Sequence, residues 1–147
     1  MSIRVSTGLR AALLSDYGLS AMMNYGVIEI YTGEQPWNAS FAPTGTLIGR
    51  VTNNGDPFAV GTTQGGLQLE LAETGGLTKV GDWRLTGIAT GDAGWWRWKW
   101  NSSDDDSDSQ YYPRMDGEVG ESLVLANNTI TPATDVAIDE FLVNIME

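Results

Sequence analysis

The sequence predicts an all-β fold: a β-sandwich or jelly roll of about seven or eight antiparallel strands, preceded by a short N-terminal arm and helix. From residue 26 onward, short segments alternate between apolar and polar residues, and turn residues separate them about every 8 to 15 positions. The length of 147 residues is that of one domain. We therefore expect an arm and helix in residues 1–25 and a single β domain in residues 26–147.

The only helical pattern lies near the N-terminus. Ser6 or Thr7 is a suitable N-cap, and Leu9, Ala12 and Leu13 follow at helical spacing. The pattern ends after about two turns, which are too few to be stable unless the helix packs on another element. A short docked helix is therefore expected here.

The six residues before this helix are small, mixed and lightly basic, which suits a mobile arm or an added edge strand. An arm of this kind can pair with an exposed sheet edge of another subunit. The candidate partner-binding residues of this region are Ile3, Arg4, Val5, Leu9 and Arg10.

Seven segments carry the strand signal after a connection over residues 15–25. They are residues 27–31, 46–52, 66–71, 79–90, 95–100, 123–126 and about 136–145. In the third of these segments, three leucines share one face, which predicts a half-buried antiparallel strand. Gly81 and Asp82 predict a bulge in the fourth, and a parity change between Ile138 and Phe141 predicts another near Asp139.

The tryptophan-rich segment at residues 95–100 follows Gly91, Asp92, Ala93 and Gly94, which predict a hairpin turn. Alternation puts three tryptophans on one face, and so much aromatic surface favours a place in the core. The opposite face then carries Trp95, Arg97 and Lys99. We expect that face to be exposed and to contact a partner, so these three residues complete the set of candidate partner-binding residues.

Composition excludes several classes of function. The chain has no Cys and no His, so thiolate chemistry, disulfides and histidine bases are excluded. A net charge of −11 argues against a protein that binds nucleic acid through phosphate contacts. The apolar runs are too short to cross a membrane, and residues 1–18 lack the apolar region of a signal peptide. We expect no enzymatic activity, because no acid, Ser or Lys has a catalytic motif around it.

The acidic segment at residues 101–109 has the spacing of a calcium loop at Asp104, Asp106 and Asp108. The pattern then fails, since Ser109 stands where the required Gly belongs and Met115 stands at the twelfth position. A solvated loop with no metal is the favoured interpretation, and we expect no cofactor.

Several phrases resemble small structural proteins of tailed bacteriophages. The phrases are VIEIYTG at 27–33 with Pro36 and TGTL at 44–47, GDWRL at 81–85, and ITPATDVAID at 130–139. The likeness extends over most of residues 7–145 and is greatest to capsid decoration, or cement, proteins, which often have a jelly-roll or β-sandwich body. The resemblance implies a homo-oligomer, dimer or trimer, that binds the major capsid protein on the outer surface of the virion after synthesis in the host cytoplasm.

Two alternatives remain open at this point. The first is another virion role, in the tail or baseplate, including adhesion to a host glycan. The second is a free carbohydrate-binding module that uses an exposed tryptophan, for which Trp95 is the candidate.

Overall fold

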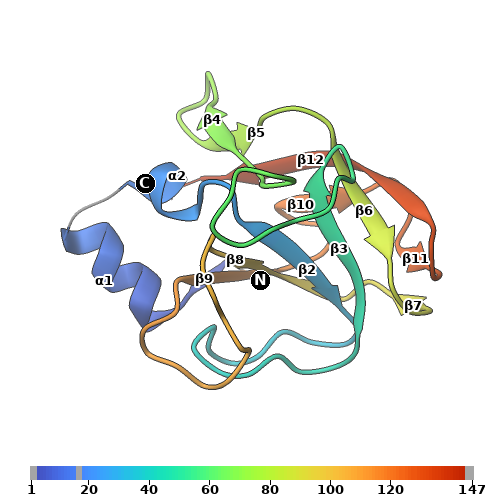
Figure 1. The fold of residues 1–147 in the computed structure, drawn as a ribbon, viewed down its shortest axis with the longest axis horizontal. Coiled ribbons are helices and arrows are strands. Elements are labelled where there is room, and N and C mark those ends of the chain that lie inside the picture. Colours follow the sequence, from blue (N-terminus) through green and yellow to red (C-terminus); the bar gives the residue numbers. More distant parts are fainter. Residues whose placement is uncertain (1–2, 16–17, 145–147) are drawn as a thin grey trace.

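The computed structural model describes residues 3–15 and 18–144, and within them the fold is mostly antiparallel β (Figure 1). A curled ten-stranded sheet has the order β1-β9-β8-β2-β3-β6-β12-β5-β4, with β10 paired to β12; β7 and β11 form a second sheet of two strands. The predicted all-β class is confirmed, although the twelve strands exceed the seven or eight expected.

Two short helices and twelve strands make up the described chain. They are β1 (Arg4–Val5), α1 (Thr7–Ser15), α2 (Leu19–Met23), β2 (Val27–Tyr31), β3 (Leu47–Asn53), β4 (Leu69–Leu71), β5 (Leu77–Lys79), β6 (Trp83–Gly87), β7 (Gly91–Asp92), β8 (Trp95–Lys99), β9 (Arg114–Glu118), β10 (Leu123–Leu125), β11 (Thr129–Ile130) and β12 (Asp135–Val143). None of the described helices is long and apolar enough to cross a membrane.

The N-terminal segment docks on the rest of its own chain. Ser6 Oγ accepts a hydrogen bond from the backbone N–H of Leu9 at 3.1 Å, which confirms the predicted cap of α1. β1 pairs with β9, with Arg4 opposite Asp116, so the described part of the arm is an edge strand of this sheet. Met1 and Ser2 lie outside the described residues. The sequence did not predict α2, which lies in the expected connection.

The strongest alternating segments gave strands close to the predicted ones. β2 has the predicted bounds, β3 is shifted by one residue, and β10 starts where expected. The predicted bulge of β12 is confirmed: Val124 pairs with Glu140 and Leu125 with Ile138, which leaves Asp139 as the extra residue. The segment at 79–90 is interrupted, because Gly81 has a φ of 82° and separates β5 from β6.

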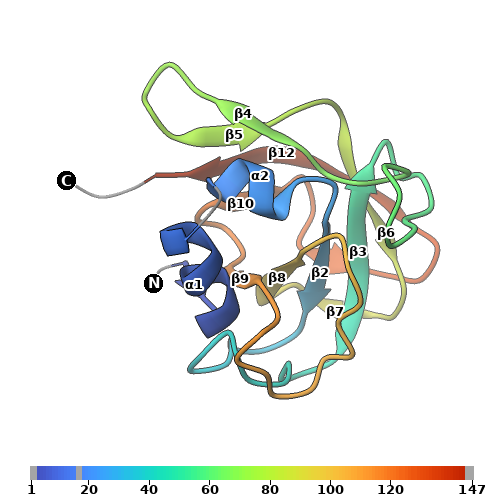
Figure 2. The ribbon, with the colours of Figure 1, turned by 60° about the vertical axis from the view of Figure 1, so that its left-hand side comes forward.

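One prediction about strand pairing and one about burial were wrong. Residues 91–94 do not close a hairpin, since β7 pairs with β11 and β8 pairs with β2 and β9. The leucine segment does not bury one whole face: Leu67 is fully buried and Leu69 half-buried, but Leu71 is 75% exposed on β4. The reason is visible in Figure 2, where β4 and β5 project as a hairpin beyond the body of the sheet.

The core lies on the concave side of the curled sheet and is centred on aromatic rings. Trp83, Trp96 and Trp98 pack around Phe141 with ring centroids 5.2–5.5 Å apart. This confirms the predicted core position of Trp96 and Trp98; Trp100 packs against the same cluster and is half-buried. Both helices contribute to the same core through the fully buried Leu9 and Met23.

Candidate functional site

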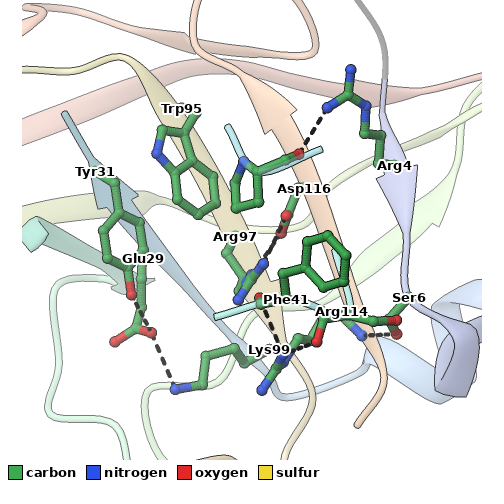
Figure 3. A network of polar contacts seen from close by, with 12 residues as sticks. Arg4, Ser6, Glu29, Tyr31, Phe41, Trp95, Arg97, Lys99, Arg114 and Asp116 are labelled. Carbon is green, nitrogen blue, oxygen red and sulfur yellow. Dashed lines mark hydrogen bonds and ion pairs between the residues drawn. The ribbon is translucent and has the colours of Figure 1, made fainter. Parts of the chain in front are cut away.

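A row of charged side chains crosses the face of the sheet opposite the aromatic core. We call this face the second face. The register places Arg4 opposite Asp116, Asp116 opposite Arg97, Arg97 opposite Glu29, and Glu29 opposite Arg50. The charges therefore alternate in sign across five neighbouring strands, β1-β9-β8-β2-β3. We call these five residues the charge row; Figure 3 labels all of them except Arg50.

The centre of the charge row is a fully buried ion pair. Arg97 donates from Nε to Asp116 Oδ1 at 2.8 Å and from Nη2 to Asp116 Oδ2 at 2.9 Å. The guanidinium also lies 5.4 Å from the ring of Trp95, while Arg97 Nη1 has no hydrogen-bond partner. Burial raises the pKa of Asp116 even though Arg97 stabilises the carboxylate. Both side chains are closed to solvent, so in this structure the pair links β8 to β9 inside the protein.

The second acid of the row, Glu29, is shared between two cations. Arg50 Nη2 donates to Glu29 Oε2 at 2.9 Å, and Lys99 Nζ lies 3.2 Å from Glu29 Oε1. Burial alone would raise the pKa of Glu29, but Lys99 and Arg50 outweigh it and the pKa is lowered. The pKa of Tyr31, whose hydroxyl donates to Glu29, is raised by burial and by this carboxylate. Glu29 is therefore held ionised by its neighbours.

A second buried pair fastens two long loops to the sheet. Arg114 donates to both oxygens of Asp104, at 2.8 and 2.6 Å, and to the carbonyls of Ser40 at 3.2 Å and Ser107 at 2.8 Å. Both charged side chains are fully buried. Burial opposes ionisation of Asp104, but the hydrogen bonds from Arg114 lower the pKa of Asp104 below its usual value. Loops 34–45 and 101–113 are thereby tied down over the second face.

These loops correct the prediction of an exposed second face. Trp95 and Arg97 are fully buried, and the side chain of Lys99 is only 12% exposed. Trp95 stacks on Tyr31 with ring centroids 4.6 Å apart and donates from Nε1 to Thr44 O at 3.2 Å. Alternation correctly separated the two faces of β8, but it did not reveal that a polar, proline-containing loop covers the second one.

The candidate residues of the arm are divided among three environments. Leu9 is in the core, and Ile3 and Val5 pack partly against it. Arg4 joins the charge row and donates to Pro36 O at 2.7 Å. Arg10 is exposed on α1, where its Nη2 donates to Thr7 Oγ1 at 3.3 Å. Only Arg4 is placed with the residues predicted on β8.

The acidic segment is only partly solvated: Asp105 and Asp108 are exposed, but three of its carboxylates bind other parts of the chain. Asp104 binds Arg114, Asp106 binds Lys99 at 3.0 Å, and Asp108 accepts from the N–H of Ala42 at 2.7 Å. Among the residues that the structure describes, no three acidic side chains lie close enough to hold a metal ion. The segment works as a cover that is pinned to the sheet by its own carboxylates.

The sequence did not single out the most exposed aromatic side chains. Trp37 is 83% exposed and borders a polar hollow of about 390 Å³ that is also lined by Arg4, Glu34, Gln35 and Glu118. The guanidinium of Arg4 lies 5.7 Å from the Trp37 ring. Both amide atoms of Gln35 are shielded from solvent without a hydrogen-bond partner. The available signal was the neighbouring Pro36, because a tryptophan next to a proline in a polar stretch has no place in a paired central strand.

A smaller cavity of about 260 Å³ lies beside Arg50, between Phe58 and Ile88. It is mainly apolar, and Thr52 Oγ1 at its base is buried without a hydrogen-bond partner.

The chain matches no protein-family model, no curated protein and no solved structure. Function must therefore be inferred from the chain's own residues.

Proposed function

We propose that the chain is a non-enzymatic structural protein of a tailed-phage virion, a capsid decoration protein that binds the outer capsid lattice and stabilises contacts between major capsid subunits. The observation that carries the proposal is that charged side chains are buried inside the protein while large aromatic side chains are exposed on its surface. The buried pair of Arg114 and Asp104 fixes loops 34–45 and 101–113 to the sheet, whereas those same loops expose the large rings of Trp37 and Tyr111. Exposed aromatic side chains on a rigid surface are typical of protein-protein contact sites.

The phage setting is supported by the phrases at residues 27–47, 81–85 and 130–139. In the same proposal the curled sheet is a jelly-roll-like body, the protein is a dimer or trimer, and the major capsid protein is its partner. A net charge of −11 keeps such a protein soluble before assembly. Many copies on one lattice make a modest contact sufficient, and binding to the intact shell shifts its equilibrium away from rupture.

Co-sedimentation with expanded shells that lack the protein tests this function directly. We expect saturable binding at a fixed ratio to the major capsid protein, together with a higher temperature of shell rupture. Serum albumin at the same concentration is the control for trapping in the pellet. Recovery of the protein in the supernatant at every concentration would refute the proposal.

Adhesion to a glycan, in a tail or baseplate, is the second candidate and is favoured by one observation. Trp37 presents a nearly free ring beside the polar side chains of Glu34 and Gln35, a combination that suits stacking on a sugar. Trp37 thus takes the place that the sequence assigned to Trp95. A printed glycan array separates the candidates: this second function requires a signal that Trp37→Ala abolishes while the fold is retained.

A further inference from the structure

β1 forms one edge of the ten-stranded sheet, and its free side offers backbone hydrogen-bonding groups. The N–H of Ser6 donates to Arg114 O at 2.9 Å, which fixes the hydrogen-bonded positions of the β1-β9 pair. Because these positions alternate along an antiparallel strand, Arg4 also faces β9, whereas the N–H and C=O of Ile3 and Val5 point away from it. No described residue accepts from or donates to those groups.

Two features of this edge limit pairing with another strand, because β1 is only two residues long and carries the charge of Arg4, but other such features are absent. β1 contains no proline and no bulge, and the side chains of Val5 and of Ile3, which precedes the strand, pack partly against the core and help to hold the segment in its extended form. Arg4 is the one charge on it. An extended, anchored strand with unpaired backbone groups is a template for strand addition.

The charge row indicates what kind of strand fits. Going outward from β3, its members carry the signs +, −, +, − and +, and the last cation is Arg4 at the open edge. A sixth strand would place one residue directly opposite Arg4 on the same face. Since opposite charges on neighbouring strands stabilise a pair and like charges destabilise it, an Asp or Glu continues the row there.

We propose that the open edge of β1 is the docking site for an extended segment of a capsid subunit, which adds to the sheet beside β1 and carries an acidic residue opposite Arg4. The inference rests on the proposed function, and it reverses the role predicted for the arm. The arm does not donate a strand to the partner; docked on β9, it accepts one. Trp37, whose ring contacts Arg4 at 5.7 Å, borders the same position and contacts the added strand.

Val5→Pro tests whether the backbone N–H of Val5 binds an added strand. Proline removes the N–H of Val5, which has no bond within the protein, and the extended backbone of Arg4 is compatible with a following proline. Val5→Thr is the matched control, because it keeps the N–H and the β-branched shape. Deletion of residues 1–10 is less suitable, since it also removes Leu9 from the core.

With expanded shells as the probe, we expect Val5→Pro to weaken binding about tenfold or more and Val5→Thr to stay within about twofold of the original chain. Hydrogen exchange read residue by residue serves even where Val5→Pro folds poorly. In the free protein the amide of Val5 should exchange quickly and that of Ser6 slowly; on the shell, Val5 should become protected.

The outcomes separate the two claims. If Val5→Pro binds like the original chain, or the Val5 amide exchanges equally fast on the shell, the edge is not the docking site, although the capsid function stands. If the original chain binds no shell, both claims are wrong.

Discussion

The buried pair of Arg97 and Asp116 allows a quantitative test of the charge row. Asp116→Asn keeps one acceptor for the guanidinium but removes the negative charge, and Arg97 cannot lose its own charge. Both side chains are fully buried, so the cation is left uncompensated at a cost of about 3–5 kcal/mol. For a chain of this length, that cost lowers Tm by about 6–20 °C. Urea unfolding followed by tryptophan fluorescence measures the free energy, with an unchanged m-value as the check on two-state behaviour.

The double variant Arg97→Met with Asp116→Leu decides whether the pair itself is stabilising. The pKa of Asp116 is raised by burial, which means that desolvation of the carboxylate exceeds the help from Arg97. We therefore expect the double variant to match the original chain or to be more stable by about 1–4 kcal/mol. A cost below about 1 kcal/mol for Asp116→Asn, or a double variant that loses as much as the two single variants combined, would show that the two buried charges do not depend on each other.

Three further predictions concern stability. The pKa values of Glu29 and Asp104 are lowered, so at these two groups the unfolded chain binds more protons, and their contribution to the free energy of unfolding should be lost as the pH falls below their ordinary values of 4.5 and 3.8. The raised pKa of Asp116 acts in the opposite sense at that one group. We expect acid titration followed by circular dichroism to show a net loss of stability, and a flat profile to about pH 3 would contradict this. Trp98→Ala should cost about 3–5 kcal/mol in urea, against less than about 0.5 kcal/mol for Trp37→Ala. Ser6→Ala should lower the free energy of unfolding by about 2 kcal/mol, measured by thermal unfolding, because the Ser6 hydroxyl accepts hydrogen bonds from the N–H groups of Leu9 in α1 and of Arg114 in β9. A change below about 0.5 kcal/mol would show that the hydroxyl does not stabilise the fold.

Periodicity predicted the parts of the fold where one face is apolar. β2 and β3, the Ser6 cap and the bulge at Asp139 all follow from residue spacing alone. These signals are local, and they succeed because the apolar face that residue spacing predicts is also the face buried in the core. The pairing of β8 with β9, across the loop of residues 100–113, has no local signal.

The central strand β9 was missed for a physical reason. Its sequence, RMDGE, lacks the β-branched residues typical of strands. Its glycine is required by a side chain of the neighbouring strand. Gly117 lies opposite Trp96, and a Cβ on it would come within 2.5 Å of the indole ring. Arg114 and Asp116 look solvent-facing in the sequence, yet both are buried against charges that come from distant segments. The two buried ion pairs were missed together with this strand. A charged residue that is buried against an opposite charge can be recognised only when the residue that carries that opposite charge is known.

The pairing of β1 with β9 also sets an order of events during synthesis. Arg4 is made at the start of the chain, but its partner Asp116 follows 112 residues later, and this is among the longest loops that the fold closes. At about 5–20 residues per second, the first strand waits on the order of 5–20 s on the ribosome before β9 exists. Both sides of β1 are then open, so nascent chains on one messenger are exposed to wrong pairing in that interval. Slow translation of residues 101–113 would lengthen that interval.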